Sequence, residues 1–330
     1  MIRIQLDQNW EFRQADTGSW MPATVPGTVH TDLLVNKAIE DPFYRLNEMQ
    51  LQWIDKKDWE YRTAFVMDRT TLARENIDLV FQGLDTYAEV FLNEKQVLQA
   101  DNMFRTWRIS GKDYLKEGTN SLRIRFLSPV NEGLKKLQAN GYPLPASNDQ
   151  SETGGLGDQR VSPFVRKAPY HFGWDWGPRL VTSGIWRPIC LEAWDEGRIS
   201  DLNVRAIKID PDHADLEVQF SVVSGKGTRL NARIYADSML IHEEALKLMQ
   251  GENPVRIPVS IQQPELWWPN GMGNQKIYRI RVIVGKGNEM ADEAEITTGL
   301  RTLRLVQEPD PDGSGKSFYF EVNGVPVFAK

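Results

Sequence analysis

The chain has 330 residues and a net charge of −6, from 39 Lys and Arg against 45 Asp and Glu. Hydrophobic residues make up 41% and charged residues 25%, which is typical of a folded globular protein of about two domains. These values exclude a mostly disordered chain, a collagen and a small disulfide scaffold, and the acidic balance argues against nucleic-acid binding.

Short alternating runs dominate the region from residue 1 to 196. Residues 28–36 predict a short helix after a Pro-Gly step. Apolar residues then alternate with polar ones at 88–92 and 122–126, the pattern of strands packed on one side. Apolar spacing of i, i+4 and i+7 predicts a helix over 129–140. Both helices are short insertions between strands and do not form a layer of an α/β fold. The length and many loops of this region favour a jelly-roll sandwich.

A second alternating series begins at Ile199 and continues to about residue 298. Its clearest runs are 216–222 and 278–284. About 100 residues of short strands is the usual size of an immunoglobulin-like sandwich, although the paired cysteines of antibody domains are absent. We therefore expect an all-β chain with a first domain at 1–196 and a second at 197–300.

Residues 301–330 form a third segment. Asn323 and Gly324 stand between two apolar, strand-like runs at 318–322 and 325–328. Asn-Gly in that position is a strong signal of a two-residue β-hairpin. A hairpin that closes on an apolar run is a poor terminus, so we expect it to lead into further structure.

The single cysteine, Cys190, cannot form an intrachain disulfide, and we expect it to be a small buried apolar residue. No run approaches 18 apolar residues, so we expect no membrane span. The N-terminus has no apolar signal core. The compartment stays open: cytoplasmic, or periplasmic or secreted if a signal peptide has been removed.

No motif predicts a metal or a cofactor. Residues 313–317 end like a phosphate-binding loop, but Asp310 stands where its first glycine should be, and a strand follows instead of a helix. The four histidines have no metal-binding spacing and no cysteine near them.

Residues 170–179 concentrate four aromatic rings, two glycines, a carboxylate and an arginine. Rings that face the C–H surface of a sugar, beside a carboxylate that accepts hydrogen bonds from hydroxyls, can hold a carbohydrate. Strand-like alternation would place Trp174 and Trp176 on one side and Asp175 on the other. The structural alternative is a Trp-rich corner of the core in which Asp175 pairs with Arg179, and the residues alone leave both open.

Several motifs together are characteristic of one protein family. The most characteristic is HFGWDWGP at 171–178, and others lie at 25–34, 41–48, 59–61, 81–86, 90–93 and 266–271. With these motifs the whole chain resembles the N-terminal part of the β-mannosidases of glycoside hydrolase family 2. It resembles them more than the β-galactosidases or β-glucuronidases of that family.

The resemblance implies a jelly-roll, galactose-binding-like domain, an immunoglobulin-like sandwich and then a (β/α)₈ barrel, of which 318–328 would be the first hairpin. It implies retaining hydrolysis of terminal β-mannosyl bonds in a β-mannoside or manno-oligosaccharide. Both catalytic glutamates would lie on the barrel, after Lys330, so no catalytic residue is expected in this chain. Asp175 would bind mannose hydroxyls in the −1 subsite, Trp174 would help wall it, and Trp176 is a further substrate-binding candidate.

Two other functions remain open. The jelly roll and its tryptophans also suit a stand-alone carbohydrate-binding module. Alternatively, the parent enzyme cleaves another sugar, as a β-galactosidase, β-glucuronidase or exo-glucosaminidase of the same family.

Overall fold

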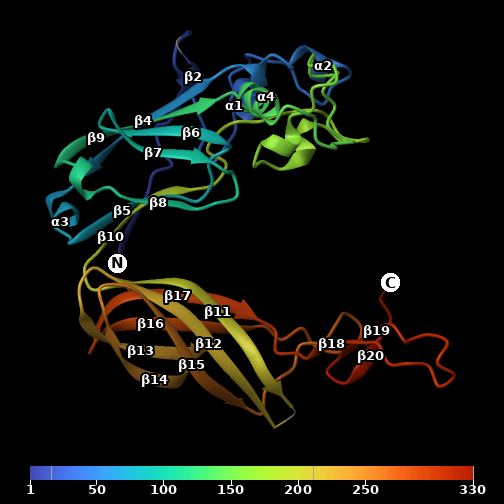
Figure 1. Cartoon of the computed structure of the whole chain (residues 1–330). Helices are drawn as coiled ribbons and strands as arrows, with labels where there is room; N and C mark the ends of the chain where they lie inside the picture. The colour runs from blue at the N-terminus through green and yellow to red at the C-terminus, as the bar shows by residue number, and fades with distance from the viewer. Residues whose placement is uncertain (16, 211, 330) are drawn as a thin grey trace. The chain divides into compact units, whose positions relative to one another are not determined.

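The computed structural model describes residues 1–15, 17–210 and 212–329 (Figure 1). It divides into two compact units, Ile2–Ala193 and Trp194–Lys330, the latter together with Met1. Each unit contains its own hydrophobic core.

The first unit is built on two antiparallel sheets. The larger sheet has six strands in the order β3-β2-β4-β9-β6-β7, and the smaller has four in the order β1-β10-β5-β8. The strands are β1 (Ile2–Gln5), β2 (Glu11–Gln14), β3 (Met21–Pro22), β4 (Trp59–Met67), β5 (Asn76–Phe81), β6 (Tyr87–Leu92), β7 (Lys95–Asp101), β8 (Trp107–Ser110), β9 (Gly118–Leu127) and β10 (Ile189–Trp194).

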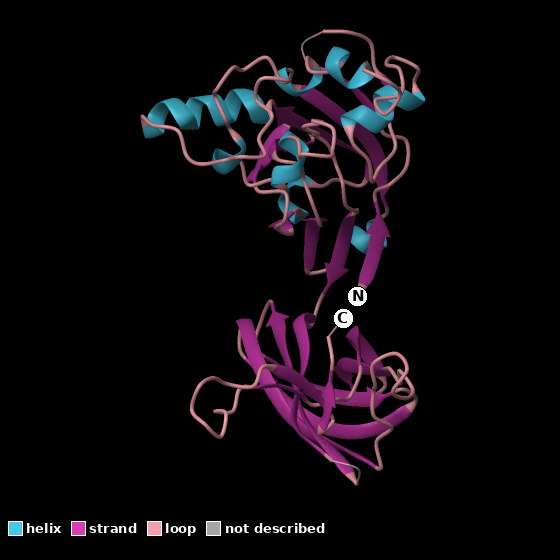
Figure 2. Ribbon diagram, turned by 90° about the vertical axis from the view of Figure 1, so that its right-hand side faces the viewer, coloured by secondary structure: helices cyan, strands magenta, loops and turns pink. Residues whose placement is uncertain are grey.

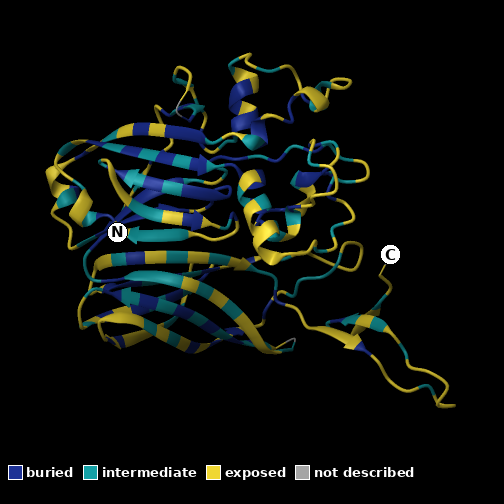
Figure 3. Cartoon of the chain, turned by 45° about the horizontal axis from the view of Figure 1, so that its top comes forward, coloured by how far each residue is buried: buried dark blue, intermediate teal, exposed yellow. Residues whose placement is uncertain are grey.

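The core of this unit lies between the two sheets. Fully buried Phe12, Tyr61 and Ile124 come from the larger sheet, and Leu79 and Leu191 come from the smaller one. On β9, buried residues alternate with half-buried ones, as the sequence pattern predicted (Figure 3). Alternation follows from the pleat, which turns successive side chains to opposite faces.

Helices occur in the first unit only, among the described residues (Figure 2). They are α1 (Val29–Val35), α2 (Asn47–Gln50), α3 (Arg69–Leu72) and α4 (Pro129–Asn140), with 3₁₀ turns η1 (Ile54–Lys56), η2 (Lys112–Tyr114), η3 (Ser162–Phe164) and η4 (Pro169–Phe172). The predicted helices at 28–36 and 129–140 are confirmed as α1 and α4. Thr28 caps α1 and Ser128 caps α4, each accepting a backbone N–H with its hydroxyl.

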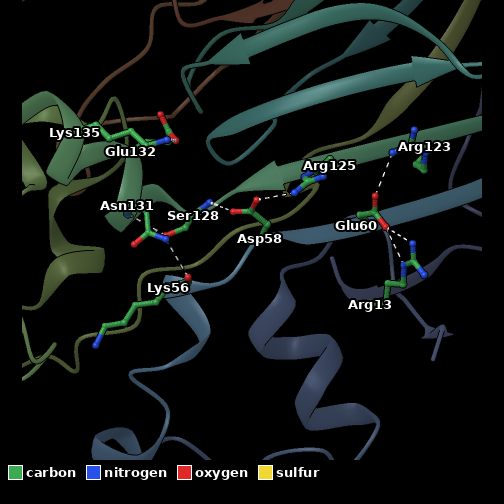
Figure 4. Close-up of polar contacts among 10 residues, drawn as sticks. All are labelled: Arg13, Lys56, Asp58, Glu60, Arg123, Arg125, Ser128, Asn131, Glu132 and Lys135. Atoms are coloured by element: carbon green, nitrogen blue, oxygen red, sulfur yellow. Dashed lines mark hydrogen bonds and ion pairs between the residues drawn. The ribbon is translucent and has the colours of Figure 1, made fainter. Parts of the chain in front are cut away.

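The larger sheet also carries a ladder of ion pairs (Figure 4). Glu60 on β4 accepts from Arg13 on β2 at 2.7 Å and from Arg123 on β9 at 3.1 Å. Asp58, next to β4, joins Arg125 of β9 to the backbone N–H of Ser128 at the start of α4. The ladder links neighbouring strands, and its last member fixes where the helix begins.

The second unit contains a three-stranded sheet, β11-β12-β15, and a four-stranded sheet, β14-β13-β16-β17. The strands are β11 (Arg198–Ile209), β12 (His213–Ser224), β13 (Thr228–Ala236), β14 (Met239–Leu248), β15 (Gly251–Gln262), β16 (Tyr278–Lys286) and β17 (Glu289–Thr298). Buried apolar residues of both sheets form one core. Two packed antiparallel sheets of this size are the immunoglobulin-like arrangement.

A small sheet of β18 (Leu303–Val306), β19 (Tyr319–Val322) and β20 (Val325–Val327) follows the sandwich. Asn323 and Gly324 join β19 to β20 with φ values of 51° and 78°, the left-handed pair that a type I′ turn requires. The predicted hairpin is confirmed. Asn323 also accepts the Thr302 N–H at 2.9 Å and donates to the Trp267 carbonyl, so the turn is held against the loop before β18.

The prediction of an all-β chain made of a jelly-roll sandwich and an immunoglobulin-like sandwich is confirmed. The finer division at 1–196, 197–300 and 301–330 stays a prediction.

Candidate functional site

The loop that carries the candidate residues begins at η4, whose last residue, Phe172, is fully buried. Gly173 follows with φ of 108°, and a Cβ there would lie 2.7 Å from the Gln150 side chain. Only glycine fits this backbone at this distance. Gln150 then holds the loop, because its backbone N–H donates to the Phe172 carbonyl at 2.9 Å and its amide donates to the Trp174 carbonyl.

Residues 174–177 form a tight turn with Asp175 and Trp176 at its tip. The backbone N–H groups of Trp174 and Gly177 each donate to the other residue's carbonyl at 3.4 Å. The two indole rings meet edge to face, with centroids 5.8 Å apart and planes at 74°. The expected strand-like backbone is therefore wrong, because residues 174–177 close as a turn, but the two rings do lie together as expected. Trp174 is half-buried, whereas Trp176 is 82% exposed and is not a core residue.

The carboxylate of Asp175 is exposed and has no hydrogen-bond or ion-pair partner in the part of the chain that the structure describes. The alternative in which Asp175 pairs with Arg179 is wrong. Arg179 is fully buried, and its Nη1 lies 2.5 Å from Oδ2 of Asp55. The turn therefore presents a free carboxylate beside two indole rings.

Arg179 anchors the other end of the loop. Its guanidinium also donates to Gln52 at 2.6 Å, and its backbone N–H donates to the Glu48 carboxylate at 2.6 Å. Burial raises the pKa of Asp55, although the Arg179 charge opposes that shift. A Cβ on Gly154 would lie 2.5 Å from Arg179 Cζ, so the guanidinium is enclosed. Breaking a buried pair of this kind leaves an uncompensated charge, so the loop is firmly tied at its base.

Two concavities meet at the turn. One, of about 560 Å³, is mainly apolar and is lined by Phe43, Tyr170, His171, Trp174, Trp176, Gly177, Pro178 and Leu180. The other, of about 440 Å³, shares Phe43, Trp174, Trp176, Gly177 and Pro178 and adds polar side chains, among them Arg45, Glu48, Gln150 and Asp175. Flat rings beside a few polar groups form a surface that suits a ligand with apolar C–H faces and hydroxyls.

Sequence reasoning selected Trp174, Asp175 and Trp176, and the structure brings all three to one turn. It missed the groups that complete the concavities, above all Phe43 and Glu48. Glu48 lies 131 positions from its partner Arg179, so no spacing could link them. The only available signal was the family-like run at 41–48, which carried no assigned role.

Other candidate chemistry is sparse. Cys190 is buried and free, as predicted, and burial raises the pKa of its thiol. No group of three or more His, Cys, Asp or Glu side chains arranged to hold a metal ion occurs in residues 1–15, 17–210 and 212–329. Within the same ranges, none of the helices has the length and apolar character needed to traverse a lipid bilayer.

Comparison with known families and proteins gives concordant matches. Residues 10–187 match the family described as "Glycosyl hydrolase 2 galactose-binding domain-like", and residues 197–301 match "Glycosyl hydrolases family 2". The chain is 36% identical to a protein named "Beta-mannosidase B" from Emericella nidulans, over 98% of this chain and 38% of that protein. It is 32% identical to "Beta-mannosidase" from Bos taurus, over 100% and 38% respectively. The chain thus spans about two-fifths of the curated relatives it matches.

Solved structures show the same similarity. The crystal structure of β-D-mannosidase from Dictyoglomus thermophilum superimposes with a TM-score of 0.89 at 35% identity, over 100% of this chain and 40% of that one. An exo-chitosanase from Amycolatopsis orientalis gives a TM-score of 0.72 at 21% identity, over 99% of this chain and 36% of that one, which shows a shared fold.

Proposed function

Because the chain belongs to glycosyl hydrolase family 2, we propose that it is the non-catalytic N-terminal portion of an exo-acting, retaining β-mannosidase. The proteins from Emericella nidulans, Bos taurus and Dictyoglomus thermophilum, each more than 30% identical to this chain, all carry the name β-mannosidase, which supports mannose over galactose or glucuronic acid. Retention needs an acid/base carboxyl and a nucleophilic carboxylate about 5–5.5 Å apart. In this proposal both glutamates lie on a barrel beyond Lys330.

The observation that carries the proposal is the free carboxylate of Asp175 beside two indole rings, on a turn tied down at both ends. In the −1 subsite Asp175 accepts hydrogen bonds from mannose hydroxyls, and Trp174 and Trp176 face the C–H surface of the sugar. Asp175 is neither acid nor nucleophile. Its contribution is orientation, together with hydrogen bonds that strengthen in the transition state.

The exposed aromatic face of the terminal hairpin also supports a larger parent protein. Phe318 is 70% exposed and Phe328 is 84% exposed, and with Phe320 they line an apolar concavity of about 530 Å³. A soluble protein seldom leaves such a cluster uncovered. In the proposed parent protein this hairpin begins the barrel, and the barrel covers these rings.

Hydrolysis of an aryl β-mannoside tests the proposal. We expect no turnover by these 330 residues and turnover by the complete protein. In the complete protein, Asp175→Ala should lower kcat/KM by about a hundredfold or more, which corresponds to a rise of several kcal/mol in the activation free energy. Asp158→Ala is the matched control, because Asp158 is an exposed aspartate in the preceding loop and outside both concavities. Hydrolysis by the chain alone, or a near-neutral Asp175→Ala, contradicts the proposal.

A stand-alone carbohydrate-binding module is the second candidate, since the concavities exist in this chain by itself. Calorimetry with mannose and manno-oligosaccharides separates the two. Millimolar or tighter binding by the chain favours a module, whereas little or no binding is expected if half of the subsite is absent. The substrate profile of the complete protein decides between mannose and another sugar.

A further inference from the structure

A buried polar network adjoins His171, one of the residues that line the apolar concavity. Asp85 and Lys167 form an ion pair whose side chains are 1% and 0% exposed. The Lys167 ammonium also donates to the Thr182 hydroxyl at 3.0 Å, and that hydroxyl donates to Asp85 at 2.7 Å. Three donors of one ammonium thus meet two carboxylate oxygens and one hydroxyl.

The network determines which nitrogen of His171 carries a proton. Nδ1 of His171 lies 2.9 Å from the Thr182 hydroxyl oxygen. A hydroxyl has one proton, and Thr182 gives its proton to Asp85, which as a carboxylate can only accept. The Thr182 oxygen must therefore accept from His171, so the proton is on Nδ1 and the lone pair is on Nε2.

The other edge of the His171 ring is open to the concavity. His171 is among the lining residues, and its Nε2 is neither enclosed nor bonded to any described residue. Burial and the nearby Lys167 charge lower the pKa of His171 to about 4, although Asp85 opposes that shift. At neutral pH the ring is an uncharged acceptor on a wall that is otherwise mostly aromatic and aliphatic.

We propose that His171 is a sugar-binding residue: its Nε2, kept unprotonated by the chain Asp85–Thr182–His171, accepts a hydrogen bond from a hydroxyl of the glycoside held at the Trp174–Gly177 turn. Asp85 and Thr182 act through the ring and are positioning residues. This inference rests on the proposed function, because the ligand is the same glycoside. It adds an uncharged acceptor on the apolar side of the turn, where Asp175 supplies a charged one.

The proton position can be measured in the 330-residue chain without any substrate. A nitrogen–proton correlation spectrum of the imidazoles separates the two neutral tautomers. We expect His171 to show the Nδ1–H form at neutral pH. Thr182→Ser keeps the hydroxyl and should keep that form, whereas Thr182→Val removes the acceptor and should change it. An Nε2–H form in the unmodified chain overturns the proposal.

Binding is tested in the complete protein with aryl β-mannosides, including analogues that each lack one hydroxyl. His171→Phe should lower kcat/KM by about tenfold to a hundredfold on the parent glycoside. On the one deoxy analogue that lacks the partner hydroxyl, the same substitution should cost almost nothing. His171→Gln keeps an amide oxygen as acceptor and should be less impaired. His242→Phe, in the second unit, is the control and should be unchanged.

The outcomes separate this inference from the proposed function. If the complete protein cleaves mannosides but His171→Phe lowers kcat/KM by the same factor on every analogue, only the role of His171 is contradicted. A complete protein that cleaves no mannoside contradicts the proposed function and removes the ligand assigned here.

Discussion

Two aspartates close to one loop show how environment sets the role of a residue. Asp55 is buried, bonded to Arg179 and therefore structural. Asp175 is exposed and free of partners in the described structure, and the turn that presents it is held by Gln150 and Arg179. A carboxylate that is already paired cannot bind a hydroxyl as strongly as one that is free, which is why Asp175 is the binding candidate.

At the residue scale, His30 should make stability depend on pH. Burial is the main cause that lowers the pKa of His30 from 6.5 to about 4. The Lys167 charge lowers it further, whereas Asp85 opposes the shift. Between these values the unfolded chain binds a proton that the folded chain does not, so the free energy of unfolding falls as pH drops from 6.5 towards 4. We expect His30 alone to contribute a loss of roughly 2 kcal/mol between about pH 7 and about pH 5, to which His171, whose pKa is also lowered to about 4, adds.

Urea unfolding of the chain and of His30→Gln at both pH values measures this effect. The variant should lose less stability on acidification, because its side chain does not titrate. Equal losses in the two proteins would show that His30 is not responsible.

At the scale of elements, the start of α4 depends on one buried serine. The Ser128 hydroxyl accepts the Asn131 N–H at 3.0 Å, and the Ser128 N–H donates to Asp58 (Figure 4). The hydroxyl also donates to the Asp55 carbonyl at 2.6 Å. The cap thus ties the helix to η1, which contains Asp55, the partner of Arg179. The same residue therefore supports both the helix and the base of the candidate loop.

Ser128→Ala should lower the free energy of unfolding of the first unit by about 1–2 kcal/mol, since it removes a cap and leaves a buried carbonyl without its donor. Lys135→Ala on the exposed side of α4 removes only a surface pair with Glu132 and should cost less than about 0.5 kcal/mol. Chemical denaturation followed by circular dichroism measures both. Equal effects would contradict the importance of the cap.

At the scale of the whole molecule, the two units have separate cores. Buried side chains from both sheets of the second unit, such as Val218, Ile234 and Val282, form a cluster of their own. A unit that buries its own apolar surface has the main requirement for independent folding.

We therefore expect residues 194–330, produced alone, to give a β-rich spectrum and a single cooperative thermal transition. Val282→Asp, which buries a charge at a fully enclosed core position, should abolish that transition. A non-cooperative melt of the unmodified segment would show that its core depends on the rest of the chain.

Local sequence was sufficient for the strands with clear alternation, β6, β9, β12 and β16, for the helices α1 and α4 and for the Asn323–Gly324 hairpin, because period-two alternation, caps and turn residues act over a few neighbours. The motif at 171–178 likewise sufficed to select the candidate loop. It could not show that residues 174–177 close as a turn, because Gln150 and Arg179 hold them through partners distant in sequence. Nor could it show the free Asp175 or the proton on His171 Nδ1. Both are decided by which polar groups meet in space, and only the tertiary structure brings them together.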